Sequence, residues 1–462
     1  MRISVPASSV LLSFLPIVVF ALAACTPTLQ PDLARLYETR IDDSGLEREA
    51  LSDQPPVVLI HGAFGARLCD ADGVEVWPAG VRGLVFSSYR ELSLPVRPDQ
   101  DKDSLLPCGI TDRVAGRDFY GRIEDTLTGA GGYQLARVGQ SLDLSRRHLY
   151  RFVYDWRQDN AVSARQLDAF VEAIRKDHGD EDLRVDIVAH SMGGLIARYW
   201  MRYGTQDVLD DNDFPVTNAG GRKVRKIVLV GTPSLGSTSA LQQLLEGANL
   251  GVNKLNQEIL LSFPSGYQLL PHPIVDSIVG AKGQTLERDI FDIEIWKAFE
   301  WGPFDPRVRR ELLSRGWSQD ELAVLEEYVH KHLERARRFV WSLTVPLQER
   351  SYGLVVFGGD CTATPARILI EDIDGESYVR LWPKEVQKPI AGLAYDKLML
   401  EPGDGAVTKA SLLSRAVLDP SVPRHRYSDF PIDYPILFCE RHSQLPGNLT
   451  FQDNLLHILL TR

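Results

Sequence analysis

The segment Val185–Gly194, VDIVAHSMGG, joins a predicted buried strand to a predicted helix through a sharp turn at Ser191. The strand is β-branched and apolar, and the residues two positions on either side of the serine, Ala189 and Gly193, are small. This pattern matches the nucleophile elbow, in which a tight turn exposes the serine hydroxyl above a sheet. The start of the following helix brings backbone N–H groups close to a developing oxyanion. The segment therefore predicts a nucleophilic Ser191; the alternative is an ordinary turn with a surface serine.

Further buried strands are predicted on both sides of this segment. Short β-branched runs bounded by Gly and Pro are typical of strands covered on both faces. Helical patterns, such as Ala161–His178 and Leu195–Tyr203, alternate with these runs, which predicts an α/β protein with a mostly parallel sheet wrapped by helices. The other predicted strands are 57–60, 150–154, 226–230, 352–357 and 434–438.

Two long stretches interrupt this alternation. Residues 69–117 are rich in Pro, Gly and Asp, and a loop of that length in a compact domain is usually functional, so we expect a lid. Residues 237–343 hold few strand signals but a charged helical run, Ser318–Trp341, and predict a helical cap insertion. The core is then divided into residues 55–236 and 344–462.

The first residues read as an export signal. Arg2 precedes an apolar run, Val10–Ala24, that is too short to span a bilayer comfortably. The run ends in Leu-Ala-Ala-Cys, which resembles the bacterial lipobox and makes Cys25 a predicted lipidation site. We therefore expect a signal peptide over 1–24, a tether over 25–54, and a lipid anchor in the cell envelope. Thr26 favours the outer membrane where the cell has one.

Chain length and net charge limit the classes of partner that we expect. The chain has 462 residues, with 51 Lys and Arg against 62 Asp and Glu, a net charge of −11. Nucleic-acid binding needs a basic face, so nucleic acid is not the expected partner. A chain of this length buries a sizeable core without help from a metal.

Cysteine usage agrees with export. Apart from Cys25, the sequence contains Cys69, Cys108, Cys361 and Cys439, which allow three pairings. We favour Cys69–Cys108 and Cys361–Cys439, because each pair lies on one side of the long insertion. Four free buried thiols are the alternative.

A serine nucleophile needs a base and an acid, which follow it in chain order in this type of site. His442 comes directly after the last predicted strand, where the order requires the base. Asp404 stands between two glycines that permit a tight turn, and it precedes His442 by one predicted strand. Its role is to hold the histidine tautomer and stabilise the imidazolium. Asp360, at a strand end, is the main rival, and Asp396 and Asp429 are weaker ones.

The oxyanion hole is expected to combine two backbone N–H groups. Met192 follows the nucleophile and supplies the first. The loop after the first strand, His61–Gly65, supplies the second, from Ala63 or, as second choice, Phe64. His61 is expected to hold this loop by hydrogen bonds.

Six motifs in order resemble one family: YDWR at 154–157, AHSMGG at 189–194, GTPSLG at 231–236, PSGYQLLP at 264–271, GDG at 403–405 and the late His442. The chain resembles the lecithin:cholesterol acyltransferase family from about residue 55 to 460. The resemblance implies an α/β-hydrolase fold with a cap, and removal of an acyl group from a lipid by a serine. It also implies the triad Ser191, Asp404 and His442, and family disulfides similar to the two favoured pairs. The first loop, however, is like that of bacterial lipases.

The YDWR motif has two interpretations. Trp156 and Arg157 can shape the rear of an acyl site. The simpler interpretation, which we favour, is that Asp155 and Arg157 pair to fix a loop beneath the edge of the sheet.

These observations predict an exported, lipid-anchored serine acyl hydrolase or O-acyltransferase of lipid esters, a lipase, phospholipase or transacylase. The expected substrate is a phospholipid or acylglycerol, with water or a lipid alcohol as acyl acceptor, and no cofactor or metal is implied. The alternative is a catalytically silent binding protein of the cell envelope. The complete triad argues against it.

Overall fold

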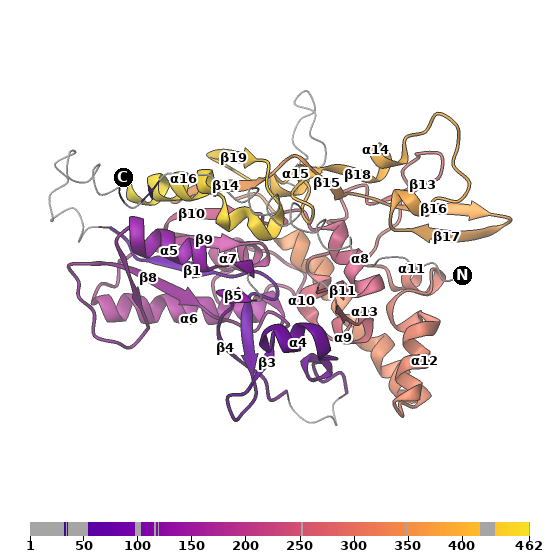
Figure 1. The fold of residues 1–462 in the computed structure, drawn as a ribbon, viewed down its shortest axis with the longest axis horizontal. Coiled ribbons are helices and arrows are strands. Elements are labelled where there is room, and N and C mark those ends of the chain that lie inside the picture. The colour runs from indigo at the N-terminus through magenta and orange to yellow at the C-terminus, as the bar shows by residue number, and fades with distance from the viewer. Residues whose placement is uncertain are drawn as a thin grey trace, which may run out of the picture.

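Figure 1 shows the computed structural model of the chain. It describes residues 32, 33, 35, 54–97, 103–114, 117–118, 120–250, 253–347, 350–415 and 430–461. The predicted signal peptide, the lipidation site Cys25 and nearly all of the predicted tether lie outside the described residues.

Seven parallel strands form the central sheet, in the order β19-β14-β10-β9-β1-β8-β7 (Figure 1). Six of the seven overlap the runs that the sequence predicted, and the edge strand β7 was missed. The predicted α/β architecture with a parallel sheet is therefore confirmed. The strands are β1 (Val57–Ile60), β7 (Tyr133–Ala136), β8 (Arg147–Phe152), β9 (Val185–His190), β10 (Val224–Val230), β14 (Gly353–Gly359) and β19 (Tyr434–Phe438).

Helices cover both faces of the sheet, and β1 shows how. Successive strand side chains point to opposite faces. Val58 and Ile60 pack into a core shared with α6 (Asn160–His178) and α7 (Met192–Tyr203). Val57 and Leu59 pack into a second core with α16 (Leu449–Leu460) and residues of α5 (Gly121–Asp125). Burial on both faces explains why β1 is an unbroken apolar run.

The segment 69–117 is not the unstructured loop that we predicted. It continues β2 (Ala66–Cys69) into a three-stranded antiparallel sheet in the order β3-β2-β4. The strands are short and interrupted by register shifts, so the sequence shows no alternation. The elements are β3 (Glu75–Trp77), α4 (Gly80–Phe86), the 3-10 turn η1 (Arg90–Leu92), β4 (Leu106–Ile110), β5 (Arg113–Val114) and β6 (Arg117–Asp118).

Residues 237–343 contain the expected helices. The longest, α13 (Gln319–Ser342), begins at a capping box in which the side chains of Ser318 and Glu321 bond each other's backbone N–H. The others are α8 (Thr238–Glu246), α9 (Gln257–Leu260), α10 (Pro264–Tyr267), α11 (Ile293–Ala298) and α12 (Pro306–Ser314), with the short strands β11 (Ala248–Asn249) and β12 (Lys254–Leu255).

One strand of this segment pairs outside it. β13 (Ile278–Gly280) runs parallel to β16 (Ile368–Ile373), which in turn pairs with β17 (Glu376–Arg380). The β16–β17 hairpin projects at the right of Figure 1, near α11. The remaining elements are β15 (Thr362–Pro365), α14 (Tyr395–Met399), β18 (Leu400–Gly403), α15 (Lys409–Leu412), and the short turns η2 (Thr126–Ala130), η3 (Gly221–Lys223), η4 (Gly302–Phe304), η5 (Pro383–Glu385) and η6 (His442–Gly447).

Two disulfides join Cys69 to Cys108 and Cys361 to Cys439, the pairs that the sequence favoured. Disulfides persist in oxidising compartments, so they indicate a location outside the cytosol. Among the described helices, none combines the length and the apolar character needed to cross a bilayer.

Candidate active site

Ser191 lies in the turn between β9 and α7, as the sequence predicted. Its backbone has φ 53° and ψ −125°, a conformation that residues other than glycine rarely adopt. The main chain is held there because the Ser191 N–H donates to the Val230 carbonyl, 2.8 Å away. Close packing leaves no space around the turn: a Cβ on Gly193 would lie 2.3 Å from the His61 carbonyl oxygen. The elbow is therefore fixed against both neighbouring strands.

The structure brings Ser191, His442 and Asp404 into one hydrogen-bonded chain. The hydroxyl of Ser191 lies 2.9 Å from Nε2 of His442. Nδ1 of the same ring lies 2.8 Å from a carboxylate oxygen of Asp404. Each residue follows a strand, β9, β19 and β18 respectively. These are the three residues that the sequence predicted as nucleophile, base and acid, and the geometry suits proton transfer from the hydroxyl to the imidazole.

Hydrogen bonds fix both oxygens of the Asp404 carboxylate. Its other oxygen accepts the N–H groups of Ala406, at 2.9 Å, and Val407, at 2.7 Å. Burial raises the pKa of Asp404, but the charge and hydrogen bond of His442 and these two N–H bonds outweigh it and leave the pKa below its usual value. The pKa of His442 is shifted in the opposite direction. Burial lowers its pKa, and the Asp404 charge and hydrogen bond outweigh that effect and leave the pKa raised.

The Asp404 and His442 side chains differ in their exposure to solvent. The Asp404 side chain is 2% exposed, whereas His442 is 21% exposed. The acid is thus shielded from water and the imidazole reaches the surface, where a substrate can meet it. The rival Asp360 instead forms an ion pair with Lys409 at 3.3 Å. Asp396 lies in α14, and Asp429 lies outside the described residues.

The loop after β1 lies directly against the nucleophile. A Cβ on Gly62 would lie 2.8 Å from Cβ of Ser191. The Gly65 N–H donates to the Gly62 carbonyl at 3.1 Å, which closes a turn around Ala63 and Phe64. Phe64 has φ 62°, so its backbone is left-handed. Both predicted donors of the oxyanion hole, Ala63 in this turn and Met192 at the start of α7, belong to elements that flank Ser191, and their role stays a prediction.

His61 supports this loop. Its Nδ1 lies 2.8 Å from the Gly62 carbonyl, its Nε2 accepts the Tyr154 N–H at 3.3 Å, and its ring stacks on Tyr154 with centroids 4.1 Å apart. Burial lowers the pKa of His61 to about 4, so the ring is neutral near neutral pH. The contacts agree with the expected supporting role.

The sequence did not identify Tyr120 as part of this site. Its buried hydroxyl accepts the Gly62 N–H at 2.7 Å and lies 2.9 Å from Nδ1 of His190. No motif surrounds Tyr120, and it is 70 residues from His190 along the chain. Only the fold brings it to the elbow.

Arg157 has the supporting role that we favoured, and more partners than expected. Its fully buried guanidinium binds Asp155, at 2.8 Å, and Asp103, at 2.6 Å. It also donates to the Leu92 carbonyl at 3.0 Å. Arg157 therefore ties the loop after β8 to the segment between Cys69 and Cys108.

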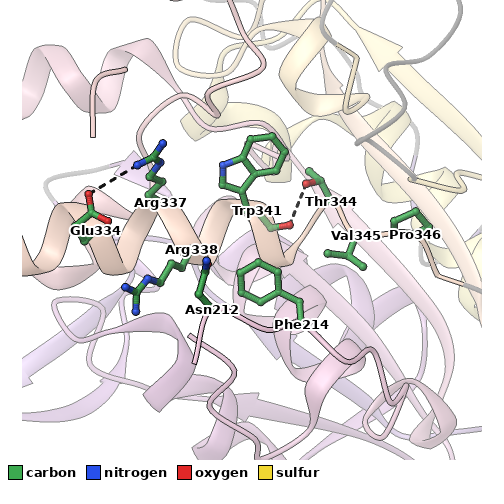
Figure 2. A pocket seen from close by; sticks show the side chains of 9 residues that line it. All are labelled: Asn212, Phe214, Glu334, Arg337, Arg338, Trp341, Thr344, Val345 and Pro346. Atoms are coloured by element: carbon green, nitrogen blue, oxygen red, sulfur yellow. Dashed lines mark hydrogen bonds and ion pairs between the residues drawn. The ribbon is translucent and has the colours of Figure 1, made fainter. Parts of the chain in front are cut away.

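A separate pocket of about 490 Å³ lies beside the C-terminal part of α13 (Figure 2). None of Ser191, His442 and Asp404 lines it. Within the described ranges, no group of three or more His, Cys, Asp or Glu side chains is placed to hold a metal ion. The residues lining the pocket are Asn212, Phe214, Glu334, Arg337, Arg338, Trp341, Thr344, Val345 and Pro346.

Several solved structures align with the chain at low sequence identity. A structure described as the Tle4–Tli4 complex aligns with a TM-score of 0.53 and 15% identity, over 88% of this chain and 98% of that chain. The mature lipase BlEst2 of Bacillus licheniformis gives a TM-score of 0.32 and 13% identity, over 88% and 93% of the two chains. EstA from Clostridium botulinum gives 0.36 and 12%, over 88% and 86%. At 15% identity, the likeness to the first of these structures concerns the fold alone.

Sequence comparison adds the family. No curated protein matches the chain at a significant level. The model of the lecithin:cholesterol acyltransferase family matches residues 142–311, which include Ser191 and the elbow. Over these residues the chain is similar to the lecithin:cholesterol acyltransferase family.

Proposed function

We propose that the chain is a serine-dependent acyl hydrolase or O-acyltransferase of lipid esters, working through an acyl-enzyme on Ser191. The observation that carries the proposal is the hydrogen-bonded chain from Ser191 through His442 to the buried Asp404. The similarity of residues 142–311 to a family named for acyl transfer from lecithin supports a lipid ester as substrate.

In the proposed mechanism, His442 accepts the Ser191 proton while the hydroxyl oxygen attacks the ester carbonyl. The negative charge of the tetrahedral intermediate is stabilised by the N–H groups of Ala63 and Met192. Asp404 stabilises the imidazolium. The imidazolium then gives its proton to the departing alcohol, and the acyl group stays on Ser191. Water or a lipid alcohol, deprotonated by His442, completes the reaction and regenerates the serine.

Segments 237–343 and 69–117 are proposed as the cap and the lid of this site. Two contacts between them support the assignment. The Leu94 N–H donates to the Ser262 hydroxyl at 2.9 Å, and the Asn253 side chain donates to the Ser87 carbonyl at 2.7 Å. The two segments thus contact each other as well as the core.

Replacing Ser191 by alanine tests the enzyme. The variant should lose turnover of a medium-chain ester, since no other hydroxyl contacts His442 Nε2 among the described residues. Ser314→Ala, at an exposed serine of α12, is the matched control and should keep wild-type turnover. Unchanged turnover in Ser191→Ala would reject the mechanism.

The acyl acceptor is tested separately, by supplying phospholipid with and without a long-chain alcohol. Transfer predicts a new ester in the presence of excess water, and hydrolysis predicts free fatty acid alone. Lipidation at Cys25, which we propose as the membrane anchor, is tested by Cys25→Ser in the bacterial host. The variant should leave the membrane fraction and lose incorporation of labelled fatty acid.

A further inference from the structure

The Tyr120 hydroxyl contacts both elements that would supply the oxyanion donors, the turn after β1 and the nucleophile elbow. Its side chain is 3% exposed and comes from the residue directly before α5. The hydroxyl oxygen accepts the Gly62 N–H, at 2.7 Å, on one side. On the other side it lies 2.9 Å from Nδ1 of His190, the residue that precedes the nucleophile. One buried hydroxyl therefore bridges the turn after β1 and the nucleophile elbow.

The hydrogen bonds of this hydroxyl have one consistent direction. Burial raises the pKa of Tyr120, so the phenol keeps its proton. Because Gly62 already donates to the oxygen, the phenol proton is available for Nδ1 of His190. Burial and the neighbouring charge of His442 lower the pKa of His190 to about 3, so the ring is neutral and one of its two nitrogens is an acceptor; we assign that role to Nδ1, which faces the phenol. His190 then carries its proton on Nε2.

Gly62 transmits this contact to the site. Its carbonyl closes the turn that contains Ala63 and Phe64, and its α-carbon packs against the Ser191 side chain. Movement of the Gly62 amide would therefore move the turn relative to the elbow. The oxyanion hole needs one donor from each of these elements, so its geometry depends on their separation.

We propose that Tyr120 is a positioning residue that sets the distance between the two oxyanion donors by bridging Gly62 and His190. The inference rests on the proposed function of Ser191. Tyr120 does not touch the reacting atoms, and it acts through the turn and the elbow. Loss of the hydroxyl would leave the Gly62 N–H and His190 Nδ1 buried without this partner, which favours a shift of either element.

The test is Tyr120→Phe, with Tyr203→Phe as the matched control. Tyr203 is also fully buried, and its hydroxyl donates to the Ser342 carbonyl at 2.6 Å, at the far end of α7. Both variants lose one buried hydroxyl and should unfold at a lower temperature than the wild type. Only Tyr120→Phe should lower kcat, by about 10- to 100-fold as expected for a misplaced site, with KM little changed.

A boronic acid inhibitor separates positioning from simple destabilisation. Its adduct with Ser191 is a tetrahedral boronate anion that places one oxygen in the oxyanion hole, so its affinity reports the donors directly. The inhibitor should lose affinity for Tyr120→Phe by about the same factor as kcat, and should keep its affinity for Tyr203→Phe. A normal kcat in Tyr120→Phe, or a reduced kcat with unchanged inhibitor affinity, would overturn the proposal.

The His190 side of the bridge gives a second test should Tyr120→Phe fail to fold. Asparagine can offer a carbonyl oxygen near the position of Nδ1, whereas leucine cannot accept a hydrogen bond. His190→Asn should therefore retain much more of kcat than His190→Leu. Equal losses in both would contradict the bridge.

These results are distinguishable from failure of the proposed function. Activity that survives in Ser191→Ala removes the function and the inference together. Activity that is lost in Ser191→Ala but normal in Tyr120→Phe and in His190→Leu removes only the inference.

Discussion

Ser191 is the residue with the most constrained backbone in the site. Its φ of 53° with ψ of −125° costs about 1–3 kcal/mol for a residue with a side chain, whereas glycine adopts such angles freely. The surrounding strands impose this conformation because the Ser191 N–H bonds Val230 and Gly62 packs against Cβ. The free energy of unfolding is therefore lower than it would be with glycine at this position.

Ser191→Gly should accordingly be more stable than Ser191→Ala. Both lose the hydroxyl, so the comparison isolates the strain of the side chain. We expect a net gain of about 1 kcal/mol, because about 0.5–1 kcal/mol of the relief is offset by the greater freedom of glycine in the unfolded chain. Denaturant unfolding of the two inactive variants measures the difference. A glycine variant less stable than the alanine variant would show that the turn is not strained.

In the proposed mechanism, Asp404 sets the pH range in which His442 can act as the base. The pKa of His442 is raised above its usual value near 6.5 by Asp404, and below that pKa the protonated ring cannot accept the Ser191 proton. The rate should therefore rise with pH through the raised pKa. In Asp404→Asn the opposing effect of burial remains, so the acidic limb of kcat/KM should move to lower pH while kcat falls by about 10⁴-fold. Asp360→Asn is the control and should leave the limb unchanged; a limb that stays in place in Asp404→Asn would contradict the assignment.

The residues of the site divide into those with a sequence signal and those without. Ser191, Asp404 and His442 could be proposed because each follows a recognisable strand or turn in the order that the fold requires. Their contact, and the pairing of Asp360 with Lys409 that separates it from the base, required the structure. Tyr120 could not be found because its two partners, Gly62 and His190, are distant in sequence and neither forms a motif with it.

At the scale of elements, burial decided what the sequence could predict. Strands covered on both faces, such as β1 and the second half of β10 (227–230), are continuous apolar runs, and the sequence located them within a few residues. The edge strand β7 and the short strands β3 and β4 carry polar, proline or glycine residues and give no such signal. Their pairing depends on partners elsewhere in the chain, including the disulfide between β2 and β4.

The contact of α7 with β1 predicts that Gly193 is irreplaceable. A Cβ there would meet the His61 carbonyl at 2.3 Å and the Ile60 carbonyl at 3.0 Å, and backbone cannot yield as a side chain can. Gly193→Ala should cost about 1–3 kcal/mol of unfolding free energy and lower kcat, since the helix start and the turn after β1 would separate. Gly129→Ala is the control, because a Cβ at that position meets nothing within 4 Å. Equal stability of the two variants in thermal unfolding would show that the close approach does not constrain the elbow.

At the scale of the whole molecule, one disulfide joins the segment before His442, the proposed base, to the start of the strand pair that leads into Asp404, the proposed acid. Cys361 lies between β14 and β15, and β15 pairs with β18, the strand that leads into Asp404. Cys439 follows β19 and precedes His442 by three residues. The bond therefore links the loop that carries His442 to the β15–β18 strand pair, whose position affects the His442–Asp404 hydrogen bond. The other disulfide, Cys69–Cys108, lies in the β3-β2-β4 sheet and includes neither loop.

Removing Cys361–Cys439 should therefore affect chemistry as well as stability. Replacing both cysteines by alanine should cost about 2–5 kcal/mol of unfolding free energy, and the same holds for Cys69 and Cys108. Only the first double variant should also slow the reaction of Ser191 with a fluorophosphonate at temperatures where the protein is fully folded, because His442 would be held less firmly against Asp404. Circular dichroism establishes the folded range, and the labelling rate within it is the measurement. Equal labelling rates in the two double variants would mean that hydrogen bonds alone, including the one from the His442 N–H to the Asp404 carbonyl at 2.9 Å, hold the base in place.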